Sequence, residues 1–193
     1  MALLLESIKI KDGLIYNLFY HQKRVNYTRK SLFNAQDILE LSKVINPPSK
    51  GVFKCRILYD LTLHKIEYIP YFPKKITSLT IISSSIEYQF KYKNRKIFDI
   101  LLNKYNKTDD IIIEKDGLLT DTSYSNIAFY DTTQWITPRK PLLYGTYREK
   151  LLDDGFLSPQ DIQPSMLKAY TKIALINAMI GFKIIKNLNP KDI

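Results

Sequence analysis

The first seventy residues contain three stretches in which apolar and polar positions alternate, as they do in a half-buried β-strand. Residues 3–10 form the first stretch, and those at 51–61 and 64–71 lie close enough together to predict a hairpin. Between them, apolar side chains at helical spacing predict a helix within 17–33. The sequence Asn-Ala-Gln-Asp is typical of a helix start and predicts a second helix at 38–45.

Pro70 and Pro73 interrupt this pattern and predict a boundary between two lobes. The first is a small α+β lobe of residues 1–73, and the second is a larger lobe of residues 74–193. The predicted fold class is therefore α+β in two lobes. In the larger lobe, strands are expected at 76–83, 110–114, 126–130, 134–137, 174–179 and 182–185, and helices at 95–105 and 147–152.

Scarcity of three residue types narrows the possible chemistry. The 193 residues include two histidines, one cysteine and six glycines. A single cysteine excludes a disulfide framework and any site with several thiolate ligands, and two histidines argue against a histidine-rich metal centre. The glycines form neither of the common nucleotide-binding loops. An enzyme with this composition is expected to take its chemistry from a bound cofactor.

The formal charge of +10 comes from 29 basic and 19 acidic residues. A nucleic-acid partner requires clustered basic residues, and no run of five or more occurs here, so compositional drift is the favoured explanation. The apolar start of the chain is broken by Glu6 and Lys9, which argues against a signal peptide. No stretch approaches 18 apolar residues, so we expect no membrane partner and a cytoplasmic location.

Seven short motifs follow one another along the chain, and each is weak when taken alone. They are Leu5-Glu6-Ser7, His21-Gln22-Lys23-Arg24, Lys91-Tyr92-Lys93-Asn94-Arg95, Thr120-Asp121 through Asn126, Thr137-Pro138, Gly145-Thr146-Tyr147-Arg148 and Asn177-Ala178.

In this order the motifs resemble those of the fold-type IV pyridoxal-phosphate (PLP) enzymes, which include class IV aminotransferases and 4-amino-4-deoxychorismate lyase. The resemblance runs from about residue 6 to residue 185. It implies a two-lobed fold like that of D-amino-acid aminotransferase, PLP as cofactor, a small-molecule amino substrate and a homodimer. Family members usually carry a strand and a turn before the first motif, so the resemblance also implies a chain truncated at its N-terminus.

Lys91 matches the lysine that holds PLP as a Schiff base in the family. From the residues alone, a solvated lysine in a basic run is the favoured interpretation of Lys91, and Lys93 is a competing candidate for the cofactor lysine. The Asn94-Arg95 pair, three and four residues after Lys91, decides for Lys91. A lysine in this role must be partly desolvated, and Phe90 and Tyr92 are expected to provide apolar surroundings.

Asp121 stands where the family has a glutamate beside the pyridine nitrogen. A carboxylate there keeps the nitrogen protonated, which strengthens the cofactor as an electron sink. Aspartate is one methylene shorter, so the loop must lie closer to the cofactor or a water must bridge the gap. The alternative is a turn-forming aspartate in a Thr-Asp-Thr-Ser stretch.

The phosphate requires positive charge and backbone amides, and two segments match the family's phosphate loops. Thr146 and Tyr147 begin a predicted helix, and Asn177-Ala178 matches the second loop. Arg24 matches an arginine suited to a charge-assisted phosphate contact, the alternative being an exposed helix arginine. His21 is expected to orient or pack rather than to ionise.

The activity favoured by the resemblance is that of aminodeoxychorismate lyase, which eliminates pyruvate to give 4-aminobenzoate. The late Asn-Ala-Met resembles the lyase branch more than the branched-chain transaminases. A class IV aminotransferase of branched-chain or D-amino-acid type is the second possibility. A non-catalytic relic of the fold and a basic nucleic-acid-binding protein are further alternatives, and the combination of Lys91 with the phosphate-loop pattern argues against the relic.

Overall fold

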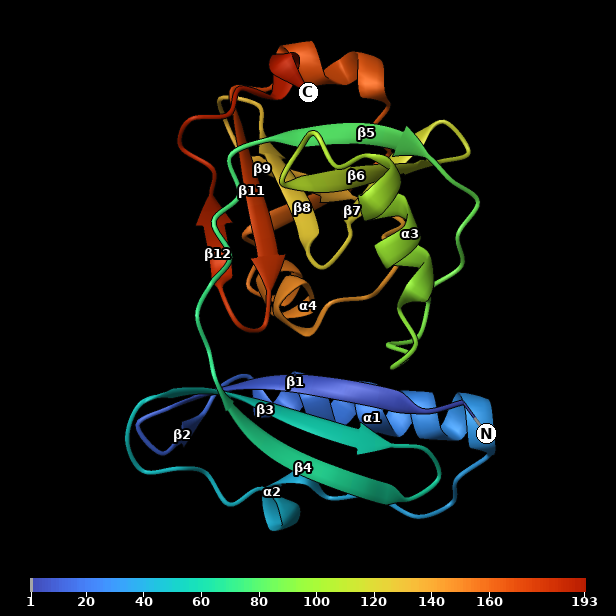
Figure 1. Ribbon diagram of the computed structural model, residues 1–193. Coiled ribbons are helices and arrows are strands. Elements are labelled where there is room, and N and C mark those ends of the chain that lie inside the picture. Colours follow the sequence, from blue (N-terminus) through green and yellow to red (C-terminus); the bar gives the residue numbers. More distant parts are fainter. Residues whose placement is uncertain (1) are drawn as a thin grey trace. The chain divides into compact units, whose positions relative to one another are not determined.

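The chain divides into two compact units in the structure, a computed structural model that describes residues 2–193 (Figure 1). Unit 1 contains residues 2–73 together with Phe90–Asn94, and unit 2 contains Lys74–Gln89 together with Arg95–Ile193. The first division falls after Pro73, where the sequence places a boundary. The segment that carries Lys91, however, belongs to unit 1, whereas the sequence placed it in the lobe of residues 74–193.

Unit 1 is an antiparallel four-stranded sheet, and α1 runs along one of its faces (Figure 1). The predicted strand at 3–10, the hairpin and the first helix are all confirmed. In spatial order the strands are β2 (Leu14–Ile15), β1 (Leu4–Lys11), β3 (Val52–Tyr59) and β4 (Leu63–Pro70), and α1 spans Leu18–Phe33.

The core of unit 1 lies between this sheet and α1. Alternation along β1 puts Leu4, Ile8 and Ile10 on one buried face, and Val25 of α1 packs in the same cluster. Glu6 occupies the second position of this row, where the pattern calls for an apolar side chain, and it is fully buried. A carboxylate in a core position requires strong partners, because an unpaired buried charge is very costly.

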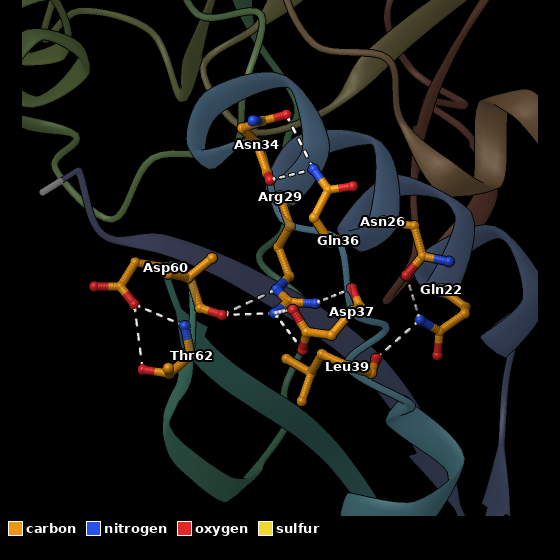
Figure 2. A network of polar contacts seen from close by, with 10 residues as sticks. Gln22, Asn26, Arg29, Asn34, Gln36, Asp37, Leu39, Asp60 and Thr62 are labelled. Carbon is orange, nitrogen blue, oxygen red and sulfur yellow. Dashed lines mark hydrogen bonds and ion pairs between the residues drawn. The ribbon is translucent and has the colours of Figure 1, made fainter.

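The second predicted helix, at 38–45, is wrong for most of its length, because α2 covers Leu41–Val44 alone. Asn34 does not begin a helix but ends α1 in the left-handed conformation, at φ 53°. Arg29 then holds the following loop, since its guanidinium donates to the carbonyl and carboxylate of Asp37 and to the carbonyl of Leu61 (Figure 2). Gln22 donates to the Leu39 carbonyl and accepts from the Leu41 amide, so the chain stays extended between these anchors.

Unit 2 is built on a larger mixed sheet in which β8 is central. The path β10-β9-β8-β7-β6-β5 defines the sheet, and β11 pairs with both β8 and β12. The strands are β5 (Leu79–Ser83), β6 (Asp110–Lys115), β7 (Leu118–Thr122), β8 (Asn126–Tyr130), β9 (Trp135–Pro138), β10 (Leu157–Gln160), β11 (Lys172–Asn177) and β12 (Gly181–Ile184), and the helices are α3 (Lys96–Lys104) and α4 (Thr146–Asp153).

Sequence patterns located most elements of unit 2, including both helices and the closing strands. Strand β5 is shorter than expected, and β7 and β10 were not expected as strands. Strand β7 escapes the alternation rule because its buried positions include Thr120, Asp121 and Thr122. Among residues 2–193, no helix combines the length and hydropathy that a membrane crossing requires.

Strands β7 and β9 pair with opposite ends of β8. Asn126 pairs with Asp121 of β7, whereas Phe129 and Tyr130, at the other end of β8, pair with β9. On its opposite side, β8 pairs with β11 along its whole length. A polar side chain at the start of β8 can therefore contact the loop before α4, as Asn126 does through the Leu143 carbonyl.

Candidate active site

Lys91 is held at the edge of the unit 1 sheet by backbone contacts with β1. The Leu5 amide donates to the Lys91 carbonyl at 2.9 Å, and the Lys93 amide donates to the Leu3 carbonyl at 2.8 Å. The side chains of Phe90 and Tyr92, on either side of Lys91, pack in the core cluster of this unit. The residues expected to surround Lys91 thus anchor its backbone.

A buried charged cluster joins β1 to α1 in the same unit. Arg24 donates from Nε and Nη2 to the two oxygens of Glu6, at 2.8 and 2.6 Å. His21 Nδ1 lies 2.6 Å from Glu6 Oε2, and both of these side chains are fully buried. Residues 21 and 24 are one turn apart on α1, so a single carboxylate can meet both.

The protonation states in this cluster follow from burial and charge. Burial by itself would raise the pKa of Glu6, but the Arg24 charge and the bond to His21 outweigh it and lower that pKa to about 2. Burial lowers the pKa of His21 despite its bond to Glu6. Glu6 is therefore an anion and His21 a neutral donor near pH 7, as expected for a histidine that orients rather than ionises.

Asp121 of β7 is the buried carboxylate of unit 2, and its partners are uncharged groups. Asn126 Nδ2 donates to Oδ1 at 2.7 Å, and the Leu143 amide donates to Oδ2 at 2.9 Å. Burial raises the pKa of Asp121 to about 6, although these two bonds and the Arg148 charge oppose the increase. This carboxylate is costly to ionise, and a cation placed beside it would be stabilised.

Arg148, which the sequence left without a role, fixes the start of α4 against β9. Its Nε donates to Thr137 Oγ1 at 3.2 Å, and its Nη2 donates to the Pro138 carbonyl at 2.7 Å. Thr137 in turn donates to the Ile127 carbonyl of β8 at 2.7 Å. The arginine of the Gly-x-x-Arg motif is therefore hydrogen-bonded to both residues of the Thr-Pro motif.

The two expected phosphate segments lie close together in unit 2, because α4 begins beside the C-terminal end of β11 (Figure 1). Thr146 is the first residue of α4, so its helix N-terminus presents backbone amides. Asn177 ends β11, and its Oδ1 accepts from the amides of Met179 and Ile180. Its Nδ2 donates to Ser125 Oγ at 2.8 Å, which ties this turn to the start of β8.

The structure thus gathers the sequence-predicted site residues into two groups. Lys91 and Arg24 lie in unit 1, and Asp121, Thr146, Tyr147, Asn177 and Ala178 lie in unit 2. Sequence reasoning gave no role to Glu6, although this residue accepts both donors of Arg24. It also gave none to Asn126, which bonds to Asp121. The one available signal was that both residues stand inside the recurring motifs.

The sequence model of amino-transferase class IV matches residues 3–188 of the chain. An uncharacterized protein of Haemophilus influenzae is 34% identical over 185 residues, which cover 92% of this chain and 98% of that one. A crystal structure from Haemophilus somnus 129pt, provisionally named a 4-amino-4-deoxychorismate lyase, has a TM-score of 0.86 and 32% identity, covering 94% of this chain and 98% of that one.

A hypothetical aminotransferase from Mycobacterium tuberculosis, solved in its PLP-bound form, has the same fold at 14% identity, with a TM-score of 0.81. The match covers 98% of this chain and 81% of that one. The family model extends over nearly the whole chain. The Haemophilus influenzae protein matches this chain over 98% of its own length, and the Haemophilus somnus structure has the same fold. On these grounds, the chain belongs to the class IV aminotransferase family, whose members are fold-type IV PLP enzymes.

Proposed function

We propose that the chain binds PLP and acts on a small amino substrate, with 4-amino-4-deoxychorismate lyase as the favoured activity. The observation that carries the PLP assignment is a continuous network in unit 2. It joins a buried carboxylate, Asp121, through Leu143 to the loop that leads into α4. A group with a cationic ring nitrogen and an anionic phosphate complements these two ends.

The residues present fit such a group. Asp121 is anionic at neutral pH yet buried, so a protonated pyridine nitrogen beside it would replace the solvation that the carboxylate lacks. The N-terminus of α4 offers backbone amides for a phosphate. Asn177 shapes the turn that follows β11 by accepting from the Met179 and Ile180 amides. Arg24, proposed as a phosphate contact from its motif, donates from Nε and Nη2 to Glu6 within unit 1, so the fit of a phosphate is argued from unit 2 alone.

PLP, when bound, supplies an electron sink for the bonds around the amine-bearing carbon of a substrate. Lys91 is proposed to bind the cofactor through its amine and then to move the proton at that carbon. Asp121 holds the proton on the ring nitrogen. In the lyase reaction, the amine-bearing carbon of the substrate ring gives its proton to Lys91. The bond between the neighbouring ring carbon and the enolpyruvyl oxygen breaks as the ring becomes aromatic, and the enolpyruvate that leaves takes up a proton to become pyruvate.

Support for the lyase activity comes from the name of the Haemophilus somnus protein, which is 32% identical over most of both chains. The Asn177-Ala178-Met179 sequence is consistent with it. A class IV transaminase would use the same lysine and the same carboxylate, so the choice between the two activities is a matter of the substrate.

The PLP assignment is tested by spectroscopy on the purified chain. We expect a visible absorption band with PLP, covalent retention of the cofactor after borohydride reduction, and loss of both in Lys91→Ala. Lys93→Ala is the matched control, because Lys93 is the neighbouring lysine and should leave the band unchanged. A protein that shows no visible band once it has been incubated with PLP and separated from the unbound cofactor would refute the assignment.

The reaction is tested by supplying two substrates to the holoenzyme. Aminodeoxychorismate should yield equal amounts of pyruvate and 4-aminobenzoate, and Lys91→Ala should abolish both products. If the holoenzyme forms glutamate from an amino acid and 2-oxoglutarate but no pyruvate from aminodeoxychorismate, the activity is that of a transaminase and not of a lyase.

A further inference from the structure

Gly145, the residue before α4, is glycine for a reason unlike that of the other glycines. All six glycines lie within the described residues, and five of them have positive φ, which side chains rarely adopt. Gly145 has φ −73° and ψ 135°, an extended conformation open to any residue. Glycine is therefore required at position 145 because space is limited there, and not because of the backbone conformation.

Asn126 occupies the space that a side chain at position 145 would need. A Cβ atom built on Gly145 would lie 1.9 Å from Asn126 Oδ1, far inside any tolerated contact. The amide orientation of Asn126 is set by its other end, because Nδ2 donates to Asp121 Oδ1 at 2.7 Å and to the Leu143 carbonyl at 2.8 Å. A flipped amide would turn its oxygen towards two acceptors, so the oxygen must point to Gly145.

Asn126 thereby touches both ends of the proposed cofactor site. Its donor holds the carboxylate that would face the ring nitrogen, and its acceptor lies against the residue that precedes the first turn of α4. The Leu143 amide closes the ring by donating to the second oxygen of Asp121 at 2.9 Å. Both Asp121 and Asn126 are almost completely buried, so water does not compete for these bonds.

We propose that Asn126 is a positioning residue that fixes the separation between the Asp121 carboxylate and the start of α4, and that Gly145 is glycine in order to admit the Asn126 amide. The inference rests on the proposed function, since these two ends are assigned to the ring nitrogen and phosphate of PLP. It adds a claim about how this chain keeps the two ends in register.

A double-mutant cycle on the full chain tests the inference. Gly145→Ala should lower the melting temperature of the PLP-free protein by about 5 °C and weaken PLP binding about tenfold or more. Asn126→Ala loses the bond to a charged carboxylate and should weaken PLP binding about tenfold as well. In Asn126→Ala/Gly145→Ala the clash is gone, so the double variant should bind no worse than Asn126→Ala alone.

Asn126→Asp is the matched control, because aspartate keeps the volume against residue 145 but loses the donor to Asp121. It should fail to rescue Gly145→Ala in melting temperature and in PLP affinity. Binding is measured by PLP titration in wild type and again in a Lys91→Ala background, where non-covalent contacts alone hold the cofactor. If Asn126→Ala fails to fold, Asn126→Ser takes its place, since serine also leaves the space free.

Additive losses in the double variant, or a harmless Gly145→Ala, would overturn the inference. Changes in melting temperature without any change in PLP affinity would reduce Asn126 to a packing role and overturn the positioning claim. Failure of the wild type to bind PLP would overturn the proposed function and the positioning role together. In that case the melting temperatures of the PLP-free variants still decide whether Asn126 is what excludes a side chain at residue 145.

Discussion

Glu6 in unit 1 and Asp121 in unit 2 are both buried strand carboxylates, yet their pKa values move in opposite directions. The pKa of Glu6 falls to about 2 and that of Asp121 rises to about 6. Burial raises both values and is the largest single influence on each. The difference lies in the partners of each carboxylate. Arg24 contacts Glu6 with two donors and His21 bonds to it as well. Arg148 is bonded to Thr137 and Pro138 instead of to Asp121.

This difference separates a carboxylate that the protein already neutralises from one that it does not, in keeping with the role proposed for Asp121. The charge of Glu6 is already neutralised by a cation of the protein, so Glu6 gains little from another cation. Asp121 accepts hydrogen bonds from neutral groups, and a cation placed beside it would remove the cost of its burial. A carboxylate poised in this way suits a partner for a protonated ring nitrogen, and Glu6 suits the fixing of α1 on β1.

The largest effect is expected from Glu6→Gln, which leaves the nearly buried Arg24 without its anion. Removing one partner of a buried ion pair costs about 3–5 kcal/mol, so urea unfolding at pH 7 should show a loss of that order. Glu6→Gln/Arg24→Gln removes both charges and should cost less than Glu6→Gln alone. Glu40→Gln, which breaks an exposed pair with Lys43, is the control and should cost below about 1 kcal/mol.

The same variant fixes the sign of the pH dependence. Because the pKa of Glu6 is lowered on folding from 4.5 to about 2, its contribution is complete above about pH 4.5. The advantage of wild type over Glu6→Gln should then disappear as the pH falls towards 2. An advantage that stayed constant down to pH 2 would show that Glu6 acts by packing and not by charge.

Asp121→Asn should show the opposite sign in the PLP-free protein. Folding raises the pKa of Asp121 from 3.8 to about 6, so wild type loses stability as the pH rises through that interval. A shift of about two units corresponds to about 3 kcal/mol. The stability of Asp121→Asn relative to wild type should therefore improve by about this amount between pH 4 and pH 7, measured by urea unfolding. A flat difference would remove the contrast with Glu6.

The sequence predicts the fold better than it predicts the partners of the site residues. Alternation located β1, β3 and β4 because their apolar faces cover a core, and a mainly polar buried strand such as β7 gave no such signal. Motif order identified Asp121 and Lys91 as candidates. The difference between the two carboxylates depends on whether an arginine is bonded to the carboxylate, and such a bond joins residues far apart in the chain.

The same limit applies to Asn34 and Gly145. The stretch at Asn34 is typical of a helix start, yet Asn34 ends α1 in the left-handed conformation, and Arg29, five residues earlier, binds Asp37 in the loop that follows. Gly145 carries an ordinary backbone conformation, so no local rule marks it as special. The atom that excludes a side chain there belongs to Asn126, which lies nineteen positions away in β8.

Thr137→Val tests whether Arg148 is held away from Asp121. Valine has the shape of threonine but loses the bond to the Ile127 carbonyl and the acceptor for Arg148 Nε. The loss of these two buried hydrogen bonds should cost about 2 kcal/mol in urea unfolding. Thr171→Val is the control, because that hydroxyl is exposed, and it should change stability by less than about 0.5 kcal/mol. An equal loss in both variants would deny Thr137 its special role.

The smallest effect is expected from His21→Asn, which asks whether Glu6 needs a second cation. Asparagine places an amide donor near the position of Nδ1, so the bond to Glu6 can persist without an ionisable ring. Because burial lowers the pKa of His21 on folding, the unfolded chain binds the extra proton, and wild type loses stability as the pH falls through 6.5. His21→Asn should lack this loss, so its stability relative to wild type, measured by urea unfolding, should rise as the pH falls from about 7.5 to about 5.5. If the stability of His21→Asn relative to wild type fell over this pH interval instead, His21 would be protonated beside Glu6. The carboxylate of unit 1 would then be neutralised by two cations rather than by Arg24 alone.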